Sequence, residues 1–292
     1  MDPLDLVKLT SLMERTSGSS DVKIGLIDGP VVTGHPDLAG GYLSEIPGRS
    51  GATCTKTDST ACVHGTFIAG IFCAKRNSSA PAICPGCTLL VRPIFSEKSA
   101  GREQMPSATP QELAAAIIDC IDAGARIINL SLALAQPSTK GEHALAEALD
   151  HSVRRGVIVA AAAGNQGTLG SSAITRHPWV IPVVGCDLRG RPITESNLGS
   201  SIGRRGLSAP GDEITSLGAE GQALTLGGTS VAVPFVTAAI ALLWSEFPAA
   251  SAAQIKLAIV QASTPRRAAV VPPLLDAEAA YRTLARANAT GE

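Results

Sequence analysis

The sequence KIGLIDGP, residues 23–30, decides how this chain is expected to fold. Between Lys23 and Asp28 the residues are apolar or glycine, which predicts a strand buried on both faces, as in a parallel sheet. The turn residues Gly29 and Pro30 follow at once. A carboxylate therefore stands at the carboxyl end of a parallel strand, which is the edge where open α/β sheets build their sites.

Short apolar runs alternate with helical segments along most of the chain, which is the pattern of one mostly parallel sheet with helices on both faces. We expect right-handed crossovers to place consecutive strands side by side. With 292 residues and no long linker, an α/β single domain is predicted at residues 21–292, preceded by an N-terminal extension at residues 1–20. The expected strands are residues 22–27, 88–94, 126–130, 157–162 and 180–185.

Helices are predicted between these strands from their capping residues. The run 231–244 is apolar, too short to span a bilayer and interrupted by Pro234, so it predicts a buried helix in which the proline occupies the first turn. The other helices are expected from Thr109 to about residue 124, from about residue 142 to Gly156, and from Ser251 to about residue 261.

Composition and charge exclude several classes of function. The net charge of −1 and the isoelectric point near 6.5 provide no excess of positive charge for phosphates, so nucleic acid is not an expected partner. Residues 1–20 mix charged and apolar side chains and lack the apolar core of a secretion signal. A cytoplasmic protein without a membrane partner is therefore expected. The sequence leaves its oligomeric state open.

The seven cysteines leave three alternatives open. Five of them lie in one stretch between the Asp28 loop and the second strand. Cysteines at such spacings remain reduced, form at least one disulfide, or bind zinc, and the sequence alone does not choose. The five are Cys54, Cys62, Cys73, Cys84 and Cys87.

Two further segments carry residues with catalytic chemistry. In HGTFIAG, residues 64–70, His64 is expected to begin a tightly packed helix. In GGTSVAVP, residues 227–234, Ser230 follows a glycine-rich turn at the start of the apolar helix, where the free N–H groups of the first turn face a developing negative charge. Taken singly, Asp28 is a turn residue, His64 a structural histidine and Ser230 a helix cap, but these interpretations do not explain why all three occur together.

A fourth segment, AAAGNQG at residues 161–167, ends a strand at Gly164 and Asn165. A side-chain amide at that edge can donate a hydrogen bond to an oxyanion. With these motifs in the order Asp, His, Ser, the sequence resembles the subtilase family of serine peptidases. Segments similar to subtilases continue from about residue 20 to residue 282, among them GHPDL at 34–38, ARIINLSLA at 125–133 and LSAPG at 207–211.

The resemblance implies a serine endopeptidase that needs no cofactor. Ser230 would attack the peptide carbonyl, His64 would transfer the proton and Asp28 would orient the imidazole, while Asn165 and the Ser230 N–H would bind the oxyanion. The substrate would bind as an extended strand. The substrate-binding residues implied are Leu130, Ser131, Leu132, Ala133 and Gly164, with the Ala133 methyl narrowing the pocket for the residue before the cut.

Several features separate this chain from secreted subtilases. Residues 73–87, which replace a calcium-binding insertion, offer no carboxylate, so no metal site is expected. The DGPV sequence followed by HP is similar to cyanobactin-type peptide-maturation proteases, which cut leader or follower segments from precursor peptides. No insertion is long enough for the lid of the macrocyclising members, which favours hydrolysis. The family also implies a cis peptide bond at His177–Pro178.

The expected function is therefore the processing of a specific precursor peptide. A general intracellular degradative protease is the alternative within the class, and a catalytically silent peptide-binding module is the alternative outside it.

Overall fold

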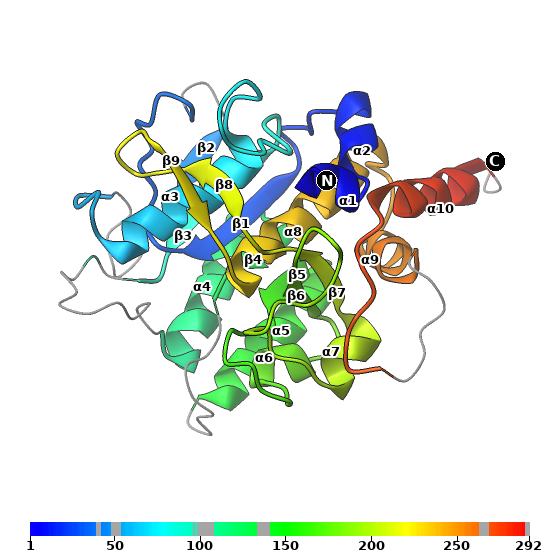
Figure 1. Cartoon of the computed structure of the whole chain (residues 1–292). Coiled ribbons are helices and arrows are strands. Elements are labelled where there is room, and N and C mark those ends of the chain that lie inside the picture. Colours follow the sequence, from blue (N-terminus) through cyan, green and yellow to red (C-terminus); the bar gives the residue numbers. More distant parts are fainter. Residues whose placement is uncertain are drawn as a thin grey trace.

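A seven-stranded parallel sheet forms the centre of the molecule (Figure 1). The computed structural model describes residues 1–38, 42–47, 54–95, 97, 108–132, 141–262 and 269–289. Each of the five strands expected from the sequence is present, with ends displaced by at most one residue. The strands of the sheet are β1 (Lys23–Asp28), β2 (Leu43–Glu45), β3 (Thr88–Pro93), β4 (Ile127–Leu130), β5 (Ile158–Ala162), β6 (Ile181–Cys186) and β7 (Leu207–Pro210).

The strand order is β2-β3-β1-β4-β5-β6-β7, which differs from the expectation that consecutive strands are neighbours. Strand β1 separates β3 from β4, because Leu26 pairs with Val91 on one side and with Asn129 on the other. The connection from β3 to β4 therefore passes over β1 to its other side. In α/β folds, ligands bind outside the carboxyl ends of the strands at such a change of winding direction.

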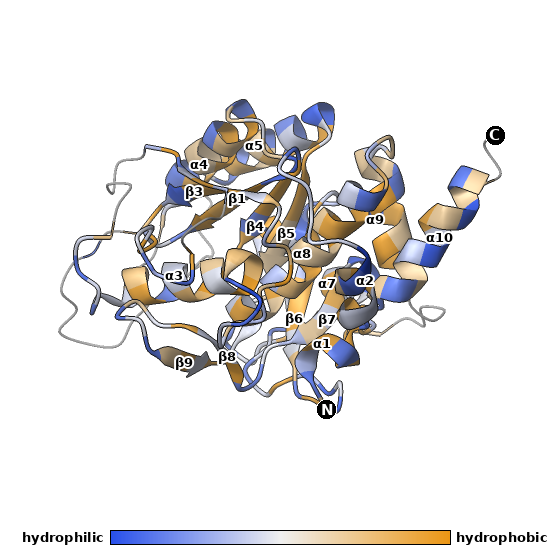
Figure 2. Cartoon of the chain, turned by 90° about the horizontal axis from the view of Figure 1, so that it is seen from above, coloured by the Kyte–Doolittle hydropathy of each residue, from blue (hydrophilic) through white to orange (hydrophobic). Residues whose placement is uncertain are grey.

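Two helical layers cover the two faces of the sheet, as Figure 2 shows. Alternate strand residues divide between them: Ile127 and Ala160 pack with the α3 and α8 side, whereas Ile128 and Ala161 pack with the α4 and α5 side. The helices are α3 (Thr60–Cys73), α8 (Thr229–Glu246), α9 (Ala252–Gln261) and α10 (Ala277–Ala289) on one side, and α4 (Pro110–Asp122) and α5 (Glu142–Arg155) on the other.

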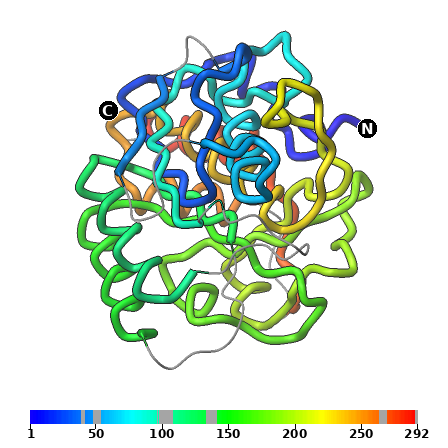
Figure 3. The backbone as a smooth tube through the Cα atoms, turned by 90° about the vertical axis from the view of Figure 1, so that its left-hand side faces the viewer, coloured from blue at the N-terminus to red at the C-terminus, as the bar shows by residue number. Residues whose placement is uncertain are grey.

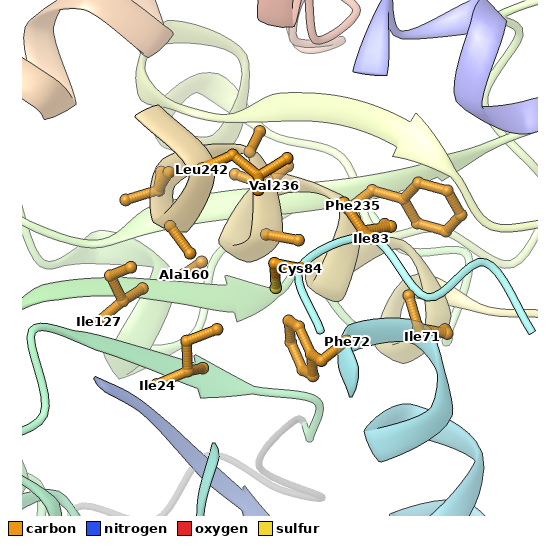
Figure 4. Close-up of a cluster of buried hydrophobic side chains, with 14 of the residues drawn as sticks. Ile24, Ile71, Phe72, Ile83, Cys84, Ile127, Ala160, Phe235, Val236 and Leu242 are labelled. Carbon is orange, nitrogen blue, oxygen red and sulfur yellow. The ribbon is translucent and has the colours of Figure 1, made fainter. Parts of the chain in front are cut away.

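Helix α8 is the central element of the larger core cluster. Figure 4 shows Phe235, Val236 and Leu242 of α8 above Ile127 and Ala160 of the sheet. The helix is long and apolar enough to cross a membrane, but 83% of its 18 residues are buried within the fold. These are the properties of the core helix of a folded domain, as its sequence predicted.

The residues predicted as an N-terminal extension pack against the same core. Helices α1 (Pro3–Leu6) and α2 (Leu9–Arg15) bring Val7, Leu9 and Leu12 into the cluster around α8, where all three are fully buried. The backbone N–H of Ala277 also donates to the carbonyl of Val7 at 3.0 Å. Packing thus continues across the boundary that the sequence placed at residue 20.

A two-stranded antiparallel hairpin, β8 (Ile214–Leu217) and β9 (Ala223–Leu226), stands beside α3, as the yellow and cyan tubes of Figure 3 show. This hairpin was not predicted from the sequence. The hydroxyl of Ser216 donates to the backbone carbonyl of Phe67 at 2.8 Å. The hairpin therefore braces α3 through a buried polar contact.

Local details confirm some sequence predictions and correct others. Capping boxes begin α4 at Thr109 and α9 at Ser251, as predicted. Helix α3, however, begins at Thr60 after the cap Ser59, so His64 lies in its second turn and not at its start.

No cis peptide bond occurs in the described chain. The expected cis bond between His177 and Pro178 is therefore wrong. The remaining short helices are α6 (Ala173–Arg176) and α7 (Ser200–Arg205).

Candidate active site

Three side chains that are far apart in the sequence form one hydrogen-bonded series at the carboxyl edge of the sheet. Asp28 Oδ1 accepts from His64 Nδ1 at 2.7 Å, and His64 Nε2 lies 3.1 Å from Ser230 Oγ. The series therefore joins the end of β1, the second turn of α3 and the first turn of α8. The sequence predicted these three residues, and the fold brings them within hydrogen-bonding distance.

Two glycines allow this approach. A Cβ at Gly29 would collide with the backbone carbonyl of Ala61, and a Cβ at Gly65 would collide with the backbone carbonyls of Gly29 and Pro30. The end of β1 and the first turns of α3 are thus in direct backbone contact. Because any side chain at either glycine would separate them, the Asp-Gly and His-Gly pairs of the motifs place Asp28 against His64.

The Asp28 carboxylate is fully buried, and Oδ1 also accepts from the Gly29 N–H at 2.6 Å. Burial by itself lowers the pKa of His64, but the negative charge of Asp28 and the hydrogen bond to it outweigh that effect and raise the pKa above 6.5. The bond from Nδ1 leaves Nε2 as the imidazole nitrogen that faces Ser230 Oγ. This is the arrangement that a general base for a serine hydroxyl requires.

Asn165 stands beside Ser230 and is oriented by the residue before it. Its Oδ1 accepts from the Thr229 backbone N–H at 2.9 Å and from the Thr229 hydroxyl at 2.8 Å. A backbone N–H can only donate, so the amide oxygen must face Thr229 and the NH2 group must point away. In the described part of the chain no protein acceptor is bound to this NH2 group, which leaves both its donors available.

The backbone carbonyl of Ser230 has an unusual partner. In an uninterrupted helix it would accept from the N–H of residue 234, but Pro234 has none. The hydroxyl of Ser131 donates to this carbonyl instead, at 2.8 Å. From the sequence, Pro234 was expected in the first turn, where its missing N–H has no consequence. That placement is wrong, because α8 begins at Thr229 and the proline is its sixth residue.

A buried chain of polar groups supports Ser131. Asn129 Nδ2 donates to Ser131 Oγ at 2.8 Å, and the Thr237 hydroxyl donates to Asn129 Oδ1 at 2.9 Å. All three side chains are buried. This series of hydrogen bonds thus links β4 to α8 directly beneath Ser230. Sequence reasoning missed Asn129 and Thr237, and the only signal was a polar residue inside each of two otherwise apolar elements.

The predicted substrate-binding residues do not all offer side chains to a ligand. Leu130 and Leu132 are buried in the core, and Ser131 is engaged with Ser230, so what this strand end can offer a substrate is its backbone. The N–H of Gly164 donates to the Thr229 hydroxyl at 3.2 Å. Ala133 lies outside the described residues.

One disulfide lies close to His64. Cys62, in the first turn of α3, is bonded to Cys54. Among the described residues, these two sulfurs and the carboxylate of Glu97 form the only group with metal-ligand spacing. A thiolate is the metal ligand, so the group cannot bind a metal while the disulfide is intact.

The other five cysteines are buried free thiols. Burial raises the pKa of Cys73 to about 12 and also raises that of Cys84. A hydrogen bond from Cys84 lowers the pKa of Cys87, so these two sulfurs of the CPGC sequence are in contact without being bonded.

The site is a catalytic triad, in which a serine, a histidine and an aspartate are joined by hydrogen bonds at the carboxyl edge of a parallel sheet. Such a triad defines a serine hydrolase, and the order of the three residues in the chain is that of the subtilisin class. Residues 19–282 match the Subtilase family, and the chain belongs to this family. It is a subtilisin-like serine endopeptidase.

Two curated subtilisins are among its relatives. Subtilisin DY from Bacillus licheniformis is 29% identical over 259 residues, which cover 87% of each chain. Subtilisin amylosacchariticus from Bacillus subtilis subsp. amylosacchariticus is 30% identical over 256 residues, covering 86% of this chain and 62% of the relative. The chain therefore spans less than two thirds of the length of that second relative.

Two solved structures of peptide-maturation enzymes share the fold almost completely. The protease domain of PatA, solved as a serine-to-alanine mutant, has a TM-score of 0.83 and 29% identity, with 92% of this chain and 97% of that chain covered. Prenylagaramide maturation protease PagA has a TM-score of 0.82 and 26% identity, with 94% of this chain and 98% of that chain covered.

Proposed function

We propose that Ser230 is the nucleophile of peptide-bond hydrolysis, with His64 as general base and acid and Asp28 as the group that orients the imidazole. Ser230 Oγ attacks the carbonyl carbon while its proton passes to His64 Nε2. The protonated imidazole, stabilised by the buried Asp28 carboxylate, then gives that proton to the departing amine. Water attacks the acyl-enzyme by the same route and releases the acid.

The tetrahedral oxyanion is bound by two donors, the NH2 group of Asn165 and the backbone N–H of Ser230. The first is oriented by Thr229, and the second belongs to the first helical turn, which has no intrahelical acceptor. Both donors are held before the substrate arrives. Preorganised donors of this kind stabilise the charge that develops in the transition state.

The proposed substrate is a specific precursor peptide, bound as an extended strand along the backbone at the end of β4. The observation that carries this choice is the likeness to PatA and PagA over at least 97% of their solved chains. PagA is a prenylagaramide maturation protease, and PatA is a patellamide maturation protease. The comparable likeness to subtilisin DY keeps general protein degradation as the second candidate.

A fluorophosphonate label tests the nucleophile. Label should appear on Ser230 of the folded protein and disappear in Ser230→Ala. It should persist in Ser208→Ala, which removes the hydroxyl of a different serine, one that is buried and donates to the backbone carbonyl of Pro272. Folded protein that takes up no label would indicate a peptide-binding module and not an enzyme.

Product mapping by mass spectrometry tests the substrate class. A library of peptides and unstructured casein are digested in parallel, with Ser230→Ala as the blank. A processing enzyme should cut few library members, each at one position, and should leave casein largely intact. Rapid cleavage of casein at many positions would instead support the degradative alternative.

We also propose a cytoplasmic location, which stays a prediction. The disulfide between Cys54 and Cys62 bears on it, because glutathione and thioredoxin keep most cytosolic thiols reduced. Fractionation of the native host, with thiols trapped by an alkylating agent at lysis, would give both the compartment and the state of this pair. Recovery of the protein only in an exported fraction would overturn the cytoplasmic location.

A further inference from the structure

A pocket of about 280 Å³ opens next to the oxyanion donor Asn165. The turn that leads into Ser230 forms one wall, and the segments after β6 and β7 form the others. Among the residues that line the pocket, Ile193 contributes an apolar side chain, and Glu195 and Asp212 contribute ionisable ones. The lining residues are Asn165, Ile193, Glu195, Gly211, Asp212, Gly227 and Gly228.

The position of this pocket relative to the scissile bond follows from the residues that line it. The strand end from Leu130 onward and Gly164 are expected to hold the residues before the cut. Of the described residues among them, Leu130, Ser131, Leu132 and Gly164 do not line this pocket, whereas Asn165 and the Gly227–Gly228 turn before Ser230 do. A peptide with its carbonyl oxygen at Asn165 therefore directs the first side chain after the cut into the pocket.

The two carboxylates give the pocket its chemical preference. Within the described residues, neither the Glu195 nor the Asp212 carboxylate has an ion-pair or hydrogen-bond partner. The basic residue nearest to Glu195 in the chain, Arg191, is held by two bonds to Asp187 at 3.0 and 2.8 Å. No side chain of the described protein thus neutralises the two negative charges that face the leaving group.

We infer that this pocket selects a lysine or arginine as the first residue after the scissile bond. The aliphatic part of such a side chain would lie against Ile193, with its charge between Glu195 and Asp212. Long basic side chains combine an apolar stem with a charged end in this way. The inference rests on the proposed function, because it names the substrate class of the same site.

Matched peptides measure this preference. Internally quenched peptides differ only at the first residue after the cut, with Lys, Arg, Gln or Glu at that position. The Lys and Arg peptides should have a kcat/KM about tenfold above the Gln peptide, the size expected of two exposed charge contacts, and the Glu peptide should be the poorest. A Lys to Gln ratio near one would overturn the inference.

Variants assign the preference to the pocket. In Glu195→Gln combined with Asp212→Asn, the Lys to Gln ratio should fall to near one. In the charge reversal Glu195→Lys, the Glu peptide should gain relative to the Lys peptide. Glu220→Gln is the matched control, because it removes one exposed negative charge from the β8–β9 turn, outside the pocket. An unchanged ratio in the double variant would overturn the inference.

Binding separates this inference from the proposed function. The same peptides, fluorescently labelled, are titrated into Ser230→Ala, and their affinities are read from anisotropy. A charge preference in binding without turnover by the unmodified chain would leave the pocket intact and contradict the proposed hydrolysis. Turnover of all four peptides without a preference would support the proposed hydrolysis and contradict the inferred selectivity of the pocket.

Discussion

The hydroxyl of Ser131 replaces the backbone donor that Pro234 removes, and so satisfies the carbonyl of Ser230. The proline removes the helical hydrogen bond one turn after the nucleophile, and the residue that follows β4 supplies the missing donor. Ser230 is thus held from two sides, by its helix and by the strand whose end is proposed to bind substrate.

We predict that Ser131→Ala lowers kcat about tenfold and changes KM little. The variant removes a buried hydrogen bond and leaves the Ser230 carbonyl and Asn129 Nδ2 without partners, which also costs about 1–3 kcal/mol of unfolding free energy. Steady-state kinetics and urea denaturation measure the two effects.

Adding Pro234→Ala to this variant provides the decisive control. Alanine restores an N–H that can donate to the Ser230 carbonyl within α8, so the double variant should regain part of the lost kcat. Ser208→Ala, which removes a similar buried bond made to the carbonyl of Pro272 and not to that of Ser230, should lower stability and leave kcat unchanged. If Ser131→Ala and Ser208→Ala affect kcat equally, Ser131 has no positioning role.

For Asn165 we predict that alanine lowers kcat by about 10²–10³, the range known for this type of donor in the relative subtilisin, with a smaller change in KM. Asn165→Asp separates two explanations. It keeps the oxygen that accepts from Thr229 but loses the NH2 donor. A loss of kcat at least as large as that of the alanine variant supports the oxyanion role, whereas near-normal activity would assign the alanine effect to displaced Thr229.

In a plot of kcat/KM against pH, the decrease on the acid side (the acid limb) should follow the pKa of His64. His64 must be neutral to accept a proton, and Asp28 raises its pKa above 6.5, so kcat/KM should fall as the pH drops through a value above 6.5. Asp28→Asn leaves burial as the dominant effect and moves this limb to lower pH, with a loss of about 10⁴ in kcat. His143→Gln, at an exposed histidine, is the control and should leave the limb in place.

The disulfide prediction concerns stability. Alkylation of the unfolded protein without reductant should modify five cysteines, and prior reduction should expose all seven. Because the bond joins residues eight positions apart, its loss in Cys54→Ser with Cys62→Ser should lower the free energy of unfolding by about 2.5 kcal/mol in denaturant titrations. Modification of seven cysteines before reduction would contradict the bond.

Much of the fold and of the candidate site could be predicted because its signals are local. The five central strands are short apolar runs bounded by turn residues, and two of the predicted helices begin with complete capping boxes, at Thr109 and Ser251. Helix α3 was predicted to start four residues late, because the Ser59 cap lacks an acidic partner three residues on and the His-Gly pair was taken for the start. The hairpin β8–β9 was not predicted, because its strands are short and show no clear alternation of apolar and polar residues.

By itself the sequence determined the class of the protein. Asp28, His64 and Ser230 each lie in a short motif that can be recognised from a few consecutive residues, and the order of the three motifs along the chain is read directly from the sequence. Tertiary structure alone decided the position of β1 between β3 and β4, the pairing of Cys54 with Cys62, and the support that Ser131 gives to Ser230. It also placed Glu195 and Asp212 in one pocket. These relations join groups from separate segments of the chain, or select one partner among several cysteines, and only packing of the whole core brings such groups together.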